Sequence, residues 1–252
     1  FEEHTDIAGK IRSDESVPLR AFSLDGSPCD CVIVAIDGGL RSWAPEIRPW
    51  LCISGINRGP NLSVDVLHSG TVSAAREASL YGLPSLSVSL ATYSHQDYSQ
   101  SIEATLALVE RLSELVTEEP GNILRPEGSR TRPIEGAGKN PLRSWFMQGN
   151  MFLNLNIPEN WNGTFQTVPL GARWYHNATD MIDQESMGVA FEVGAARIVD
   201  EEIEMTDCHA IASGSASITP LASWPQNLPL GVPQSIMQAS TVMDADGMPS
   251  WL

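Results

Sequence analysis

The chain has 252 residues, 42% of them hydrophobic, which is long enough for one large domain with a core of its own, or one domain with an arm. It carries 31 Asp and Glu residues against 15 Lys and Arg residues, a formal net charge of −16. Polymeric nucleic acid and anionic membranes bind to basic surfaces, so this composition argues against both partners but does not exclude a mononucleotide. No apolar run has transmembrane length, and no signal-peptide pattern opens the chain.

The first predicted elements are a strand and a helix. Residues 16–24 read as a strand closed by a turn, and Ser27-Pro28 is typical of an N-cap followed by Pro in the first helical turn. The next apolar residues recur at helical spacing, namely Val32, Ile33, Ile36 and Leu40. This helix is expected to end near Gly38-Gly39 or shortly after. Asp30 is interpreted as a carboxylate that favours the helix start, not as a catalyst.

The most specific stretch runs from residue 50 to residue 72. Residues 50–53, Trp-Leu-Cys-Ile, predict a short buried strand that leads into a loop rich in Gly, Pro and Asn. Ser69 is expected to cap a helix over residues 71–81, with Gly82 as its C′ residue. The first N–H groups of a helix have no intrahelical acceptor and lie at the positive end of the helix dipole, so they favour an anion.

Two kinds of ligand are therefore predicted at this stretch. The candidate residues for phosphate or substrate are Asn61, Ser69, Gly70 and Thr71. Asn57, at the carboxyl end of the strand, offers a side-chain oxygen that suits a hard divalent cation. The alternative is an ordinary turn, in which Asn and Gly supply left-handed conformations and Ser only caps the helix.

Residues 85–90 alternate small polar with apolar side chains and predict the next strand. Strand, helix and strand in succession are typical of a parallel βαβ unit. The loop 91–97 would then lie on the same side as the candidate site, where His95 could contact the bound ligand, although a lone loop histidine is more often simply solvated. A longer second helix is marked by Ile102, Leu106, Val109, Leu112 and Val116.

Periodicity stops over residues 117–144, where Pro, Gly and charged residues dominate. Five of the 15 basic residues lie here: Arg125, Arg130, Arg132, Lys139 and Arg143. This segment is either a basic flap over an anionic substrate or a mobile surface insertion, and the insertion is the favoured interpretation. Strand alternation returns over residues 151–157, where Asn154 and Asn156 are expected to satisfy backbone groups.

The cysteines indicate a reducing compartment. They are Cys29, Cys31, Cys52 and Cys208, with no Cys-x-x-Cys among them. The first two stand two apart on a predicted helix, so their side chains diverge and cannot easily form a bridge or a shared metal site. We therefore expect buried free thiols and a cytoplasmic protein. The three Asn-x-Ser/Thr sequons, at Asn61, Asn162 and Asn177, are read as chance.

Several motifs resemble the SurE family of 5′/3′-nucleotidases. The string Ser-Gly-Ile-Asn-Arg-Gly-Pro-Asn at 54–61, followed by His-Ser-Gly-Thr-Val at 68–72, is similar to the family's central loop. Further similar segments are Gly-Ser-Pro-Cys-Asp-Cys-Val at 26–32, Leu-Asn-Leu-Asn-Ile-Pro at 153–158, Thr-Asp-Cys-His-Ala at 206–210 and Ser-Ile-Thr-Pro-Leu at 217–221. The resemblance covers most of the chain from about residue 16 to residue 221.

The resemblance implies a Rossmann-like α/β/α fold, with a core over residues 1–145 and the remaining core strands plus a β-rich oligomerisation arm over 146–252. It implies hydrolysis of nucleoside 5′- or 3′-monophosphates with Mg²⁺ or Mn²⁺, in a homodimer or homotetramer.

The family's metal site also uses an Asn-Asp-Asp-Gly motif, and this sequence contains no Asp-Asp pair. No catalytic residue can therefore be named. The chain is interpreted as a fragment of such an enzyme, with a catalytically inactive nucleotide-binding or assembly module as the alternative.

Overall fold

The computed structural model of the chain describes residues 2–6, 19–116, 119–125, 140–184, 188–193, 197–224, 232 and 234–252. The strand predicted over 16–24 falls partly outside these ranges. Its described part forms β2 (Phe22–Ser23), which pairs with β1 (Glu2–Glu3). Within the described ranges, no helix combines the length and the hydropathy that crossing a membrane requires.

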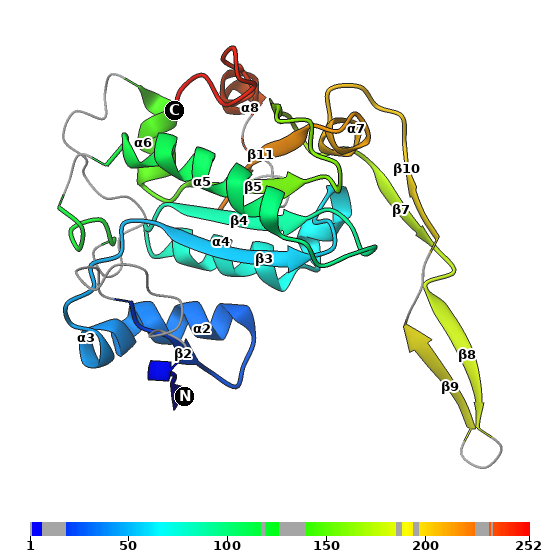
Figure 1. The fold of residues 1–252 in the computed structure, drawn as a ribbon, viewed down its shortest axis with the longest axis horizontal. Helices are drawn as coiled ribbons and strands as arrows, with labels where there is room; N and C mark the ends of the chain where they lie inside the picture. The colour runs from blue at the N-terminus through cyan, green and yellow to red at the C-terminus, as the bar shows by residue number, and fades with distance from the viewer. Residues whose placement is uncertain are drawn as a thin grey trace.

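A mixed five-stranded sheet forms the centre of the body (Figure 1). In spatial order its strands are β3 (Cys52–Arg58), β4 (Ser85–Leu90), β5 (Met151–Ile157), β11 (Ala216–Ala222) and β6 (Phe165–Thr167). β3 and β4 run parallel, as the strand–helix–strand pattern predicted, and β5 runs parallel to β4. β11 is antiparallel to β5 and parallel to β6. The sheet therefore combines strands from both sides of residue 145.

Helices cover both faces of this sheet (Figure 1). α4 (Gly70–Leu80) packs on one face, and α5 (Ser99–Ser113) and α6 (Pro141–Met147) pack on the other. Because side chains alternate along a strand, Leu86 and Val88 of β4 join the core beneath α5 and α6. The serines that alternate with them point to the opposite face, where Ser79 Oγ of α4 donates to Ser85 Oγ at 2.9 Å. This arrangement confirms the predicted Rossmann-like α/β fold.

β3 is longer and less buried than the sequence predicted. The sequence predicts that the strand ends at residue 53, but it continues to Arg58, through residues that are expected to form a loop. Ile53 is 44% exposed, because β3 lies at an edge of the described sheet and pairs there only with β4. The pairing shifts register between Ser54 and Asn57.

α5 confirms the second predicted helix, but its buried face differs from the apolar stripe in the sequence. Ile102 and Leu106 are 49% and 62% exposed, whereas Leu108 and Leu112 are buried. The buried face also carries small or polar residues such as Ser101. A purely hydrophobic pattern does not include such residues, so the apolar stripe alone does not define the buried face.

The predicted N-terminal helix is α2 (Pro28–Val34). Ser27 Oγ accepts a hydrogen bond from Asp30 N–H at 3.3 Å, and Asp30 Oδ2 accepts one from Ser27 N–H at 2.7 Å. This capping box confirms that Asp30 stabilises the helix start. The chain continues through η1 (Ala35–Gly39), a π-helical turn kinked at Gly38, and α3 (Leu40–Trp43), so the helical run ends shortly after Gly39.

The predicted β-rich arm projects from the body as a two-part ribbon (Figure 1). β7 (Arg173–His176) pairs antiparallel with β10 (Arg197–Asp200) and forms the stem. Beyond it, β8 (Thr179–Gln184) pairs antiparallel with β9 (Gly188–Val193). α7 (Asp207–Ala212) then returns the chain to the sheet.

The basic segment 117–144 is more ordered at its ends than predicted. α6 begins at Pro141, inside the segment, and Asn140 caps it. Arg125 lies 5.3 Å from the centroid of the Trp224 ring and donates to Asn150 Oδ1 at 3.0 Å. Arg130, Arg132 and Lys139 lie outside the described residues, so the choice between flap and insertion stays a prediction for them.

The Pro-rich C-terminal stretch, for which the sequence predicted no element, completes the main core. It forms α8 (Gln234–Ser240), and Met248 and Trp251 are buried in the core beneath α5 and α6. Arg143 Nε donates to Trp251 O at 2.6 Å, which ties this stretch to α6.

The four cysteines are free, as predicted. The expectation that they are all buried is wrong, because Cys31 is exposed and Cys29 and Cys52 are half-buried. Cys208 alone among them is fully buried.

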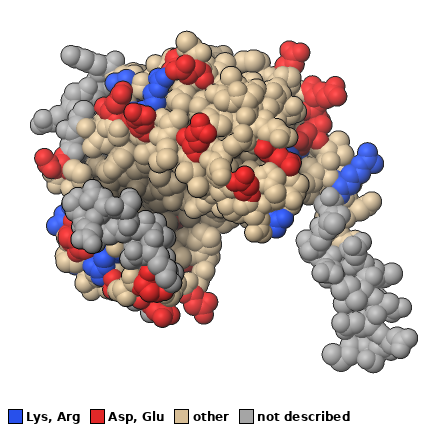
Figure 2. Space-filling model, in the orientation of Figure 1, with Lys and Arg blue, Asp and Glu red and all other residues tan. Residues whose placement is uncertain are grey.

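On the face of the body shown in Figure 2, acidic side chains are spread widely and basic ones are isolated, so that face offers no basic footprint for polymeric nucleic acid.

The described core predicts a sharp contrast between two leucines of α5. Leu108→Ala should lower the free energy of unfolding by about 2–5 kcal/mol, because it removes a fully buried side chain and leaves a cavity. Leu106→Ala, its exposed neighbour, should stay within about 0.5 kcal/mol of the unsubstituted chain. Urea denaturation measures both, and equal losses would contradict the orientation of this helix.

Candidate phosphate-binding site

Asn57 lies near the carboxyl end of β3 and is half-buried. Its Nδ2 donates to Gly59 O at 2.9 Å. In the described part of the chain, no hydrogen bond reaches its Oδ1. Asn57 thus keeps a side-chain oxygen available at the sheet edge where the sequence predicted a cation ligand.

The N-terminus of α4 is capped as predicted. Ser69 Oγ accepts a hydrogen bond from Val72 N–H at 3.1 Å. The N–H groups of Gly70 and Thr71 come before Val72 in the first turn, where no intrahelical acceptor exists. Gly70 is exposed and Thr71 is half-buried. Ser69 therefore acts as a cap, and two adjacent N–H groups remain for an anion.

The start of α2 lies beside the start of α4. A Cβ atom added to Gly70 would come within 3.1 Å of Pro28 Cγ, closer than most side-chain contacts. Glycine at position 70 therefore allows the two helix starts to approach closely. This proximity brings a second capped helix start next to the predicted phosphate position.

Asn61 is buried in the sheet, with 5% of its surface exposed. Its Nδ2 donates to Ser89 Oγ at 2.7 Å, and its backbone N–H donates to Asn156 Oδ1 at 2.8 Å. Its carbonyl oxygen accepts from Asn154 Nδ2 and Asn156 Nδ2 at 2.8 and 3.1 Å. These bonds confirm that the two asparagines of β5 satisfy backbone groups. They place Asn61 as an anchor of the loop, and its predicted contact with substrate stays a prediction.

The next residues of the loop, η2 (Ser63–Leu67), are held by the buried carboxylate of Asp207. It accepts N–H groups from Ser63 at 2.9 Å, Gly171 at 2.6 Å and Cys208 at 2.8 Å. Burial raises the pKa of Asp207, and the three backbone donors oppose that rise. Ser63 adopts a left-handed φ of 50°, and its Oγ bridges Gly171 O and Arg173 N–H.

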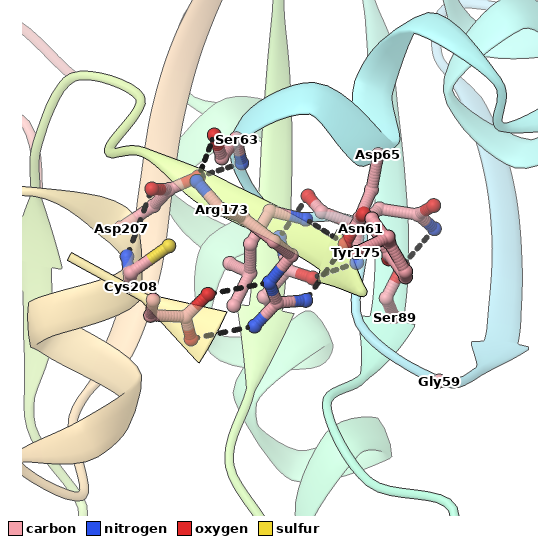
Figure 3. A network of polar contacts seen from close by, with 12 residues as sticks. Gly59, Asn61, Ser63, Asp65, Ser89, Arg173, Tyr175, Asp207 and Cys208 are labelled. Carbon is pink, nitrogen blue, oxygen red and sulfur yellow. Dashed lines mark hydrogen bonds and ion pairs between the residues drawn. The ribbon is translucent and has the colours of Figure 1, made fainter. Parts of the chain in front are cut away.

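Arg173, on the arm stem, joins the same loop (Figure 3). Its Nη1 lies 2.8 Å from Asp65 Oδ2, and both side chains are 6% exposed. Its Nε and Nη2 donate to the two oxygens of Asp200 at 2.6 and 2.8 Å. Burial acts to lower the pKa of Arg173, but the hydrogen bonds to Asp200 and the charges of Asp65 and Asp200 outweigh it and raise the pKa. The guanidinium therefore stays charged.

Asp65 receives further donors. Tyr175 donates its hydroxyl to Asp65 Oδ1, and Leu62 N–H donates to Asp65 Oδ2 at 3.0 Å. Burial, followed by the hydrogen bond to Asp65, raises the pKa of Tyr175. The stem of the arm is thus fastened to the segment between Asn57 and Ser69.

The roles of these residues in holding η2 in place were not predicted from the sequence. Arg173 and Asp207 lie in segments that resemble the family, so the motifs pointed to them without giving a function. Asp65 carried no such signal. Its partner Arg173 is 108 residues away in the chain, and local patterns do not show pairs of that separation.

The described residues do not by themselves fit a hard divalent cation. Mg²⁺ takes six oxygen ligands in octahedral geometry, usually including one or two carboxylates beside several waters. Among the described residues, no three His, Cys, Asp or Glu side chains gather closely enough to hold a metal ion. Asn57 would supply one neutral oxygen, so any metal site here needs ligands from beyond the described ranges.

The fold and the site define a Rossmann-like α/β protein with an open helix N-terminus suited to phosphate. The family described as survival protein SurE matches residues 4–179. A 5′-nucleotidase SurE from Synechococcus sp. (strain JA-3-3Ab) is 34% identical over 214 residues, or 84% of this chain and 69% of that protein. The corresponding protein of Syntrophotalea carbinolica is 33% identical, over 84% of this chain and 71% of its own length. This chain belongs to the SurE family.

A solved structure supports the fold assignment. The crystal structure of the SurE protein from Aquifex aeolicus matches with a TM-score of 0.54 and 27% identity. The match covers 81% of this chain and 69% of that one. The α/β architecture described above is therefore shared with a SurE protein.

The buried ion pair on the arm stem gives a testable expectation. Arg173→Ala should lower the free energy of unfolding by about 3–5 kcal/mol, because it strands two carboxylates, one of them deeply buried. Arg111→Ala removes an arginine that also pairs with two carboxylates, Asp244 and Asp246, but at a partly exposed position, and should cost about 0–1 kcal/mol. Similar values for the two variants in chemical denaturation would contradict the burial of the Arg173 cluster.

Proposed function

We propose that the protein is a phosphomonoesterase that hydrolyses nucleoside 5′- or 3′-monophosphates. The observation that carries this proposal is the open N-terminus of α4, in a chain that is 34% identical to a protein named 5′-nucleotidase. The phosphate would accept hydrogen bonds from the N–H groups of Gly70 and Thr71 and from the Thr71 hydroxyl. The Ser69 hydroxyl can donate to the same anion while its oxygen caps the helix.

The electrostatics favour this placement in a protein of net charge −16. A phosphate dianion is repelled by the overall charge, so binding needs a local source of positive potential. The helix dipole and unpaired N–H groups of α4 supply one without any basic side chain. Donors already fixed by the fold do not have to reorganise as charge develops during the reaction.

We also propose a requirement for Mg²⁺ or Mn²⁺, with Asn57 as one ligand. Since the described residues do not complete a cation site, its carboxylates would come from a strand carrying Asn-Asp-Asp-Gly. β3 has room for such a strand, because in the described sheet its outer edge is unpaired. The proposed compartment is the cytoplasm, where thiols stay reduced.

A second candidate function is a nucleotide-binding or assembly module without catalysis. The specific observation that favours it is the lack of a carboxylate cluster among the described residues. In that case the N-terminus of α4 would still bind phosphate, but no hydrolysis would follow. Both candidate functions predict nucleotide binding, but only the phosphomonoesterase predicts phosphate release.

The decisive experiment compares the chain as it stands with a version that carries an Asn-Asp-Asp-Gly strand ahead of Phe1. We expect phosphate release from nucleoside monophosphates with magnesium or manganese only in the extended version, and a chelator should abolish it. Asn57→Ala in that version should weaken metal binding by about tenfold or more, because even residues that only hydrogen-bond to a metal ligand contribute about that much to metal affinity. Ser69→Ala should mainly change KM or turnover, because the hydroxyl faces phosphate.

Melting temperatures must accompany these assays, because Asn57 also bonds to Gly59 and Ser69 caps α4. A folded extended protein whose activity is indifferent to both the chelator and Asn57→Ala would refute the proposed metal site. A folded extended protein that binds nucleotide but releases no phosphate would favour the assembly module.

The projecting arm supports a proposal about assembly. β8 and β9 extend away from the body (Figure 1), and a single two-stranded ribbon is marginally stable in water on its own. We expect a homodimer or homotetramer in which arms pack against another copy, consistent with the prevalence of closed symmetric oligomers. Light scattering at micromolar concentration tests this, and a folded monomer would count against it.

A further inference from the structure

Tyr93 lies at the carboxyl edge of the sheet, next to the end of the strand that carries Asn57. It follows β4 by three residues, and Leu90 at the end of β4 is in register with Arg58 at the end of β3. Arg58 Nη2 donates to Tyr93 O at 2.5 Å, so this hydrogen bond joins the end of β3 to the loop that follows β4. The function of Tyr93 is not accounted for by the phosphate-binding groups described above.

The Tyr93 ring lies directly against Gly59. A Cβ atom added to Gly59 would come within 2.3–2.6 Å of the ring and hydroxyl atoms of Tyr93, and Gly59 has a φ of +106°. A side chain at position 59 is therefore excluded both by the ring and by the backbone conformation. Gly59 O accepts the Asn57 side chain at 2.9 Å. One residue thus separates the aromatic ring from the proposed cation ligand.

The loop beneath the ring is held rigidly. Glu159 accepts hydrogen bonds from Ser94 Oγ at 2.6 Å and from Thr92 Oγ1 at 3.1 Å, on both sides of Tyr93. Ala91 N–H donates to Ile157 O at 2.7 Å. Despite this fixed backbone, 59% of the Tyr93 surface is exposed. The fold therefore presents an aromatic ring to solvent in a preorganised position, which reduces the entropic cost of binding a flat ligand.

We infer that Tyr93 is the stacking platform for the nucleobase of the substrate. This inference rests on the proposed function and identifies the residue that distinguishes a nucleotide from a smaller phosphate ester. Every base has a π-face, and stacking on an aromatic side chain contributes about 1–3 kcal/mol per base. A hollow of about 420 Å³ borders the same loop and gives the base or sugar room, lined by Leu90, His95, Asp97, Gln100, Glu159 and Asn160.

A purely structural role for Tyr93 makes a different prediction. If the ring only shields Gly59, its removal should affect all phosphate esters alike. If the ring binds the base, its removal should affect nucleotides and spare a substrate that has the same sugar and phosphate but no base. The overall charge and the phosphate contacts are the same for both substrates, so they cancel in the comparison.

The test measures binding of adenosine 5′-monophosphate and ribose 5-phosphate to the full chain by isothermal titration calorimetry with magnesium chloride present. For the unsubstituted chain we expect the nucleotide to bind about tenfold more tightly than the sugar phosphate. Tyr93→Ala and Tyr93→Leu should abolish this ratio by weakening nucleotide binding alone, whereas Tyr93→Phe should keep it. Leucine retains bulk over Gly59 and so separates stacking from shielding.

Leu106→Ala serves as the matched control, since it truncates an equally exposed apolar side chain on α5. It should leave the ratio unchanged. The inference is overturned if the ratio persists in Tyr93→Leu, if both ligands weaken together, or if the unsubstituted chain shows no preference for the nucleotide. This experiment measures binding and does not depend on phosphate release. If the extended protein releases no phosphate, that result refutes the proposed hydrolysis but not the role of Tyr93.

Discussion

The ion pair between Arg173 and Asp65 is the contact on which the geometry of the candidate site depends. It joins the arm stem to η2, between the strand that carries Asn57 and the helix that begins at Gly70. Asp207 holds the first residue of η2 through backbone N–H groups, and Asn61 anchors the residues before it. An isolated buried charge would be costly, so each carboxylate here is paired or hydrogen-bonded.

The chemistry of the site follows from this fixed frame. A loop held by side chains from three separate parts of the chain cannot easily change its path, so the first N–H groups of α4 keep one direction. The largest apolar cluster lies beneath α5 and α6, while the α4 face of the sheet carries Ser89, Asn154 and Asn156. The polar face therefore positions the loop, and the apolar face supports the sheet that bears it.

Local features of the sequence predicted local structure well. The Ser27–Asp30 capping box, the Ser69 cap and the strand over β5 follow from short-range rules, and the structure confirms all three. The length of β3 was predicted wrongly, because it depends on what packs against the strand, and the buried face of α5 depends on its packing partners in the same way. The partners of Asp207 and Asp65 lie 144 and 108 residues away, and no periodicity encodes such pairs. The role of Asn57 stays a prediction, since its other ligands lie beyond the described residues.

The open side of β3 has a consequence for handling the chain without the strand that is proposed to pair with it. Residues 52–57 carry no charged side chain, Ile53 is 44% exposed, and in the described sheet only β4 pairs with this strand. An uncharged edge with unpaired backbone groups is a template for strand addition from another molecule. Such pairing need not close into a ring, so it leads towards open-ended aggregates and not to a defined oligomer. A single lysine at position 53 would act as a gatekeeper at this edge while leaving the N-terminus of α4 untouched.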